Sequence, residues 1–197
     1  MRAFILVGYV ALTMVLASCG SQANIDKGSS DPASTPSNIE EVNGSSAEAT
    51  EGDFVYRLVS EKEEYRKGEP VKVYGELEYI GDKEFVTIYH SASPFYFPIT
   101  ETTRNYGIAY MMDQPLLNTT LKRGEPLREE YKRGGGYGEQ DEKDYVDFIK
   151  SLWEDGFPEG HYVVNGYVDF YVQANTDGED NKQSYKIQTD IDFQVKE

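Results

Sequence analysis

The chain has 197 residues, a net charge of −16 at pH 7 and a single cysteine. So negative a charge excludes nucleic-acid binding through the phosphates and makes an anionic membrane surface repel the chain. One cysteine excludes an internal disulfide, and acidic residues spread along the whole chain are typical of a solvated surface rather than of a dedicated acidic site.

An apolar stretch from Ala3 to Ala17 follows one basic residue, Arg2, and ends in Leu-Ala-Ser-Cys-Gly at residues 16–20. A basic start, an apolar core too short to span a bilayer comfortably and a small-residue exit predict a secretory signal peptide over residues 1–18. The block resembles the lipobox of bacterial lipoproteins, which implies cleavage before Cys19 and covalent attachment of diacylglycerol to its thiol.

This resemblance implies a chain held at the outer, extracytoplasmic face of the cell membrane, with Cys19 as the lipid attachment residue and no other cofactor. Two acyl chains of the palmitate type hold a protein where one does not, because each buried methylene contributes about 0.8 kcal/mol. Loss of Arg2 with the leader makes the mature chain one unit more negative.

Residues 19–52 are expected to form the lipidated N-terminus and a disordered tether. Beyond the cysteine this stretch is rich in Ser, Ala, Gly, Asn and Glu and has no aromatic residue, so it buries too little apolar surface to offset the entropy of ordering. A flexible coil of this length reaches roughly 30 Å and lifts the folded part off the lipid head groups. Residues 53–197 have the length of one domain.

Short strands separated by Gly, Pro and Asp turns predict an all-β sandwich for residues 53–197. Apolar residues alternate with polar ones over 71–79, up to the turn at Gly81 and Asp82, and residues 85–89 are expected to form the antiparallel neighbour of that strand.

The last two strands are predicted to form a hairpin. Apolar and polar side chains alternate in residues 162–172 and 185–195, as in strands with one buried and one wet face. The linker Asn175–Asn181 is rich in the Asn, Asp and Gly that turns require. Its oxygen ligands also suit calcium, but their spacing departs from an EF-hand loop, so we favour a turn and leave calcium binding open.

One segment, about 141–153, has helical periodicity instead. Tyr145, Phe148, Ile149 and Leu152 fall at i, i+3, i+4 and i+7, and acidic residues occupy the first turn. Because a stripe at this spacing is usually core, we expect one inserted amphipathic helix packed over an end or face of the sandwich rather than a partner-binding helix.

Three pieces of the domain open strands with similar corners: Lys-Gly-Glu-Pro-Val at 67–71, Thr-Leu-Lys-Arg-Gly-Glu at 120–125 leading into 127–131, and Phe-Pro-Glu-Gly-His-Tyr-Val at 157–163. They resemble the immunoglobulin-like domain of the intracellular proteinase inhibitor group of bacilli, and small lipoproteins that carry such a domain. The resemblance implies an immunoglobulin-like antiparallel β-sandwich and a role in binding or inhibition, and it supplies no inhibitory residue.

No catalytic or metal site is predicted, so we expect a protein that is not an enzyme. The two histidines, His90 and His161, lie at strand ends without a nucleophile-elbow motif, and with a lipidated cysteine they cannot build a zinc site. The glycine-rich run 134–138 lacks the Lys-Ser/Thr that a phosphate-binding loop needs, which favours a surface loop.

Three of the 16 tyrosines are candidate binding residues. Tyr167 and Tyr171 flank Asp169 on the wet side of their strand, and Tyr96 lies in the aromatic loop 93–98. Tyrosine offers a large contact area at little entropic cost, which suits a paratope-like surface or sugar stacking. Alternatively, the 141–153 helix covers Tyr167 and Tyr171 and the aromatic loop plugs one end of the sandwich.

Together these features predict a lipid-anchored binding module for an extracytoplasmic protein partner, with proteinase inhibition as its most specific version. Two alternatives stay open: a glycan or cell-wall binding domain that uses exposed aromatics, and an accessory subunit of an envelope complex.

Overall fold

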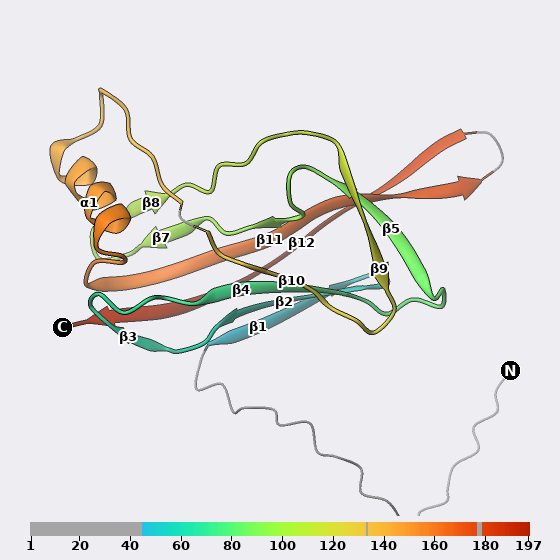
Figure 1. Ribbon diagram of the computed structural model, residues 1–197, viewed down its shortest axis with the longest axis horizontal. Helices are drawn as coiled ribbons and strands as arrows, with labels where there is room; N and C mark the ends of the chain where they lie inside the picture. The colour runs from blue at the N-terminus through green and yellow to red at the C-terminus, as the bar shows by residue number, and fades with distance from the viewer. Residues whose placement is uncertain (1–44, 133, 177–178) are drawn as a thin grey trace, which may run out of the picture. The chain divides into compact units, whose positions relative to one another are not determined.

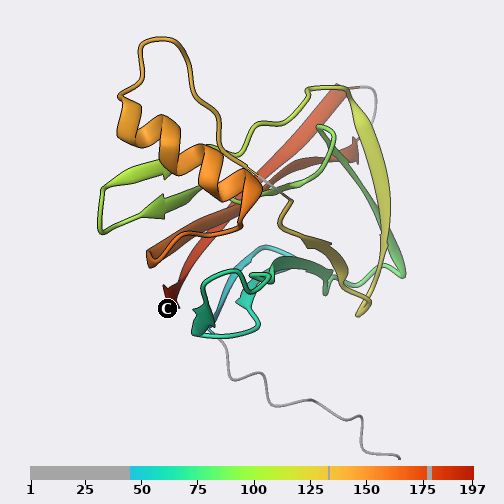
Figure 2. The ribbon, with the colours of Figure 1, turned by 60° about the vertical axis from the view of Figure 1, so that its left-hand side comes forward.

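The computed structural model describes residues 45–132, 134–176 and 179–197. They form two β-sheets that face each other, with one helix at one end (Figures 1 and 2). Cys19, the signal peptide and most of the tether lie outside the described residues. No helix in the described ranges is long and apolar enough to cross a membrane.

The first sheet is antiparallel. Its strands, in spatial order, are β1 (Ser46–Glu51), β2 (Phe54–Ser60), β4 (Val73–Tyr79) and β10 (Leu127–Glu130).

The domain begins earlier than predicted, because residues 46–51 are a strand and not part of a disordered tether. They pair with β2 from Ser46 opposite Val59 to Glu51 opposite Phe54. The only apolar residues of this strand are Ala47 and Ala49, which pack against the core. Its sequence therefore lacks the apolar surface from which a strand is predicted, and pairing with β2 is what orders it.

The second sheet is built around one long strand, β11 (Gly160–Thr176). β12 (Glu179–Lys196) pairs with one edge of β11 in continuous register, from Gly160 opposite Val195 to Thr176 opposite Glu179, which confirms the predicted hairpin. The opposite edge of β11 is taken in succession by three short strands, namely β5 (Phe85–His90), β6 (Phe95–Tyr96) and β7 (Ile99–Glu101). The sheet is completed by β3 (Glu64–Arg66), parallel to β12, by β8 (Tyr106–Ile108) and by β9 (Leu117–Lys122).

The expected pairing of 71–79 with 85–89 is wrong. β4 lies between β2 and β10, whereas β5 lies in the other sheet between β11 and β9. Gly81 is buried at the crossing between the sheets, where a Cβ atom would come within 2.5 Å of the Tyr79 hydroxyl and 2.6 Å of Asp53 Oδ2. Alternation identifies the buried face of each strand, but it does not identify the neighbouring strand.

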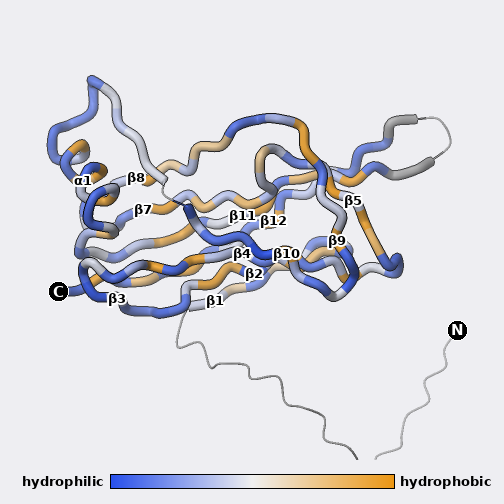
Figure 3. The backbone as a smooth tube through the Cα atoms, in the orientation of Figure 1, coloured by the Kyte–Doolittle hydropathy of each residue, from blue (hydrophilic) through white to orange (hydrophobic). Residues whose placement is uncertain are grey.

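The core lies between the two sheets and is rich in aromatic rings. Apolar positions recur along the strands of both sheets (Figure 3), and the largest fully buried side chains are Tyr56, Tyr65, Tyr162, Phe54, Phe95, Phe97 and Phe193. The side chains predicted to face inward from β11 and β12 are buried or half-buried, and their polar neighbours point outward. The predicted mainly β sandwich with one inserted helix is confirmed.

Helix α1 (Lys143–Glu154) packs over the β7–β8 end of the second sheet (Figure 2). Its buried stripe is Phe148, Ile149 and Leu152, as predicted. The Tyr106 ring of β8 contacts the rings of Tyr145 and Phe148 at centroid distances of 5.3 and 5.2 Å. The glycine loop before the helix is fastened to it, because Trp153 Nε1 donates to the Gly134 carbonyl at 3.0 Å.

Candidate functional site: a stacked tyrosine face

The outward surface of β11 carries two tyrosine pairs with a carboxylate between them. We call Tyr89, Tyr96, Tyr167, Tyr171 and Asp169 the tyrosine face. Residues 167, 169 and 171 point the same way because side chains alternate along a strand. β6 places Tyr96 opposite Tyr167, and β5 places Tyr89 opposite Tyr171.

Both pairs are stacked nearly parallel. The ring centroids of Tyr96 and Tyr167 lie 4.7 Å apart, with an angle of 4° between the ring planes. Those of Tyr89 and Tyr171 lie 5.1 Å apart, with an angle of 11° between the planes. From β12, on the other side of β11, the Lys186 ammonium lies 4.5 Å from the Tyr167 ring centre, and that of Lys182 lies 4.8 Å from the Tyr171 ring centre.

Each β11 tyrosine is thus held between a second tyrosine and an ammonium group. An aromatic pair contributes about 0.5–1.5 kcal/mol beyond area burial, and an exposed cation–π contact contributes about 0.5–1 kcal/mol. These contacts fix the orientation of the rings before any ligand arrives.

The Asp169 amide donates to the Pro94 carbonyl at 2.9 Å. Its side chain is exposed and makes no hydrogen bond or ion pair with any described residue. Lys186 is its cross-strand partner, but the Lys186 ammonium lies over Tyr167 instead. Burial, the neighbouring Tyr96 and the Asp169 charge raise the pKa of Tyr167.

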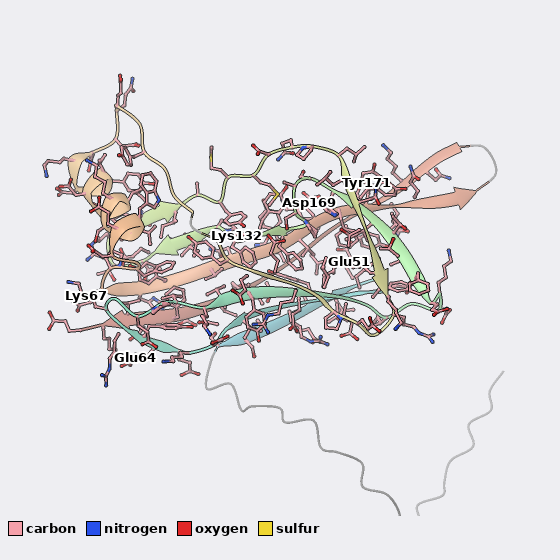
Figure 4. All side chains as sticks on the ribbon, viewed as in Figure 1. Glu51, Glu64, Lys67, Lys132, Asp169 and Tyr171 are labelled. Atoms are coloured by element: carbon pink, nitrogen blue, oxygen red, sulfur yellow. The ribbon has the colours of Figure 1, made fainter. Side chains whose placement is uncertain are left out.

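A hollow of about 310 Å³ opens between the two tyrosine pairs and the connection from β8 to β9, residues 109–116. Figure 4 shows Asp169 and Tyr171 at this place on β11. The hollow is lined by Tyr89, His90, Ser91, Tyr96, Gln114, Pro115, Leu116, Asp169, Phe170, Tyr171 and Ser184. The connection is tied down beside it, since Ser91 Oγ donates to Gln114 Oε1 at 3.1 Å and the Ala92 amide donates to the Asp113 carbonyl at 3.3 Å.

The three predicted tyrosines lie on one surface, Tyr96 and Tyr167 in one stack and Tyr171 in the other. The proposed cover by the helix is wrong, because α1 packs on β7 and β8 at the far end of the sheet (Figure 1). The side chains of the aromatic loop 93–98 point to both sides of the sheet. Phe95 and Phe97 are buried in the core, whereas Tyr96 points outward.

Tyr89 and the two lysines were missed by the sequence reasoning. Alternation around the buried Ile88 places Tyr89 on the wet face of β5, and this signal was available. Its stacking on Tyr171 depends on register across two strands separated by more than 80 positions, which no local pattern encodes.

A second polar cluster lies near the other end of β11. His161 Nδ1 lies 2.9 Å from Thr102 Oγ1, and His161 Nε2 lies 2.8 Å from Asp192 Oδ2. Three such residues in a row suggest an activated hydroxyl. Thr102 Oγ1 also donates to the His161 carbonyl at 3.1 Å, and these hydrogen bonds tie the residue after β7 to β11 and β12.

His90 is held in a comparable way. Its Nδ1 lies 2.8 Å from the Ser91 carbonyl and its Nε2 lies 2.9 Å from Thr119 Oγ1. Among the described residues, no group of three or more His, Cys, Asp or Glu side chains is arranged to hold a metal ion. In the Asn175–Asn181 turn, the side chains up to residue 180 lie outside the described ones. Calcium binding by this turn therefore stays an open prediction.

No protein-family model matches the chain, and no curated protein matches it. Among solved structures it is similar to a protein from Archaeoglobus fulgidus known from its crystal structure, with 6% identity over 74% of this chain and 90% of that one, at a TM-score of 0.28. A likeness this slight carries no argument about function.

Proposed function

We propose that the protein is a non-enzymatic binding module, lipid-anchored through Cys19 at the outer face of the cell membrane, and that the tyrosine face is the surface it presents to a protein partner. The observation that supports this most directly is the double stacking of four half-exposed tyrosines on one side of the sheet. The immunoglobulin-like character of the sandwich belongs to the same proposal.

Preformed stacks favour protein binding because little side-chain freedom remains to be lost. Ordering a flexible side chain at an interface costs about 0.5–1.5 kcal/mol, and rigid rings avoid most of that cost. A sugar ring stacks on a free aromatic face, but Tyr167 and Tyr171 already use both of their faces for a tyrosine and a lysine. The geometry therefore favours a partner that contacts ring edges and hydroxyl groups over a stacked glycan.

Exposed apolar side chains lie on and beside the β8–β9 connection, part of which lines the hollow. On the β8–β9 connection Met111 is 84% exposed and Leu116, which lines the hollow, is 69% exposed; Leu117 at the start of β9 is 45% exposed. Aromatic residues and methionine are enriched at protein interfaces, where apolar contact excludes water from the polar centre. In the proteinase inhibitor version of the proposal, this exposed connection is the segment that is presented to the protease.

The proposal is tested by partner capture from solubilised envelope of the source bacterium. The immobilised full chain is compared with the variants Tyr96→Ala and Tyr171→Ala, and bound proteins are identified by mass spectrometry. Tyr137→Ala is the matched control, because Tyr137 is an exposed tyrosine beside α1, with its ring tilted at 32° against that of Trp153 and away from the tyrosine face.

One exported protein should be enriched by the wild-type chain and by Tyr137→Ala, and lost with the other two variants. Equal capture by all four chains would remove the tyrosine face from the proposal. Retention on purified cell wall without any enriched protein would favour the glycan alternative. If the captured protein is a protease, titration of its activity decides the inhibitor version.

A further inference from the structure

The hollow beside Asp169 has a chemical character of its own within the tyrosine face. Most of the described residues that line it are polar or aromatic, Pro115 and Leu116 are aliphatic, and none of them is a lysine or an arginine. The one imidazole at its border, His90, has both ring nitrogens in contact with Thr119 Oγ1 and the Ser91 carbonyl. Among the described residues that line it, Asp169 carries the only formal charge.

The Asp169 carboxylate forms no ion pair with a described residue, although a lysine is its cross-strand neighbour. Lys186 stands opposite Asp169 in the register, yet its ammonium lies over Tyr167, and neither lysine of β12 lines the hollow. A carboxylate between two rigid aromatic pairs attracts a cation. The net charge of −16 on the whole chain also attracts basic partners, so the long-range and local charges both favour a cationic ligand.

We propose, resting on the protein-binding function above, that this hollow receives an arginine side chain of the partner, with its guanidinium paired to Asp169. A guanidinium is planar and carries five donors in a fixed fork, which suits several acceptors spread around one cavity. Besides Asp169, the hollow offers Ser184 and the tied pair of Ser91 and Gln114. A lysine ammonium is compact and strongly hydrated, so it gains less from these acceptors and from aromatic walls.

The probe is arginine amide, titrated into the ¹⁵N-labelled full chain in mild detergent and followed by two-dimensional NMR. Lysine amide and citrulline amide are titrated in parallel, since citrulline keeps the planar shape and loses the charge. Asp169→Asn is compared with Asp190→Asn, a matched variant that removes an equally exposed carboxylate from the outer face of β12, away from the hollow.

Arginine amide should give saturating shifts confined to the residues of the hollow. Asp169→Asn should weaken its apparent affinity about tenfold, as expected for a hydrogen bond to a charged group, and Asp190→Asn should weaken it by less than about twofold. Lysine amide should bind more weakly than arginine amide, and citrulline amide should not saturate.

Non-saturating shifts, equal effects of the two asparagine variants, or binding of lysine or citrulline amide as tight as that of arginine amide would each overturn the inference. These failures are separate from failure of the proposed function. Partner capture that depends on Tyr96 and Tyr171 would persist if the hollow takes no guanidinium, whereas loss of that dependence would remove the partner surface itself.

Discussion

The substitution Tyr56→Phe is expected to stabilise the domain. Tyr56 is fully buried in β2, and its hydroxyl has no hydrogen-bond partner among the described residues. Burial also raises the pKa of Tyr56, which reflects the apolar surroundings of the hydroxyl. An unpaired buried hydroxyl costs about 1–3 kcal/mol. Removing it should raise the free energy of unfolding by about 1 kcal/mol, or the Tm by about 2–4 °C for a domain of this size.

Tyr65→Phe is the control of opposite sign. Tyr65 is equally buried, but its hydroxyl lies 3.0 Å from Ser60 Oγ, accepts from the Lys62 amide at 3.1 Å and donates to the Lys72 carbonyl at 3.1 Å. Its removal takes the acceptor from the Lys62 amide and one hydrogen bond each from Ser60 Oγ and the Lys72 carbonyl, which keep their other partners, and it should cost about 1–3 kcal/mol. Urea unfolding followed by Trp153 fluorescence and by circular dichroism measures both variants.

A destabilised Tyr56→Phe would refute the reasoning, because it would mean that the hydroxyl makes a favourable contact. Gly166→Ala supplies an independent check. Its Cβ would lie 2.6 Å from the Tyr56 hydroxyl and 2.8 Å from Leu58 Cδ2, an overpacking that costs about 1–3 kcal/mol. Part of this cost should disappear in the Tyr56→Phe background, while the clash with Leu58 remains, so a double-mutant cycle should show coupling.

Three further outcomes are expected. Ile149→Ala should lower the free energy of unfolding by about 2–4 kcal/mol because Ile149 is fully buried on the inner face of α1. Lys150→Ala, at an exposed position of the same helix, should change it by less than about 0.5 kcal/mol in the same urea unfolding. Burial by itself raises the pKa of Glu101, but hydrogen bonds from Thr103 and Arg104 outweigh it and lower that pKa. The ionised Glu101 therefore stabilises the fold fully above the unfolded pKa of about 4.3, and this stabilisation is lost as pH falls through the lower folded pKa. Glu101→Gln should lower the free energy of unfolding at pH 7, and this loss should shrink in unfolding curves measured at about pH 3. Cys19→Ser should abolish incorporation of labelled palmitate and release the chain from the membrane fraction, and membrane retention of that variant would contradict the lipid anchor.

The β character of the chain and its final hairpin follow from sequence alone. Alternation in 162–172 and 185–195 reports a local property, the side of each strand that is buried, and the structure confirms it. The helical stripe of Phe148, Ile149 and Leu152 is local in the same sense. Such patterns hold because the period of the backbone decides which side chains share a face.

Which strands became neighbours was decided by tertiary packing. β1 has too little apolar surface to be recognised as a strand, and it is ordered by its pairing with β2. The placement of β4 and β5 in different sheets likewise depends on how the two sheets pack around one core. The tyrosine face belongs to this second group: outward tyrosines can be predicted one by one, but their stacking and the hollow beside Asp169 arise from the register of three different strands against β11. Register is a relation between distant segments, and local sequence periodicity carries no information about it.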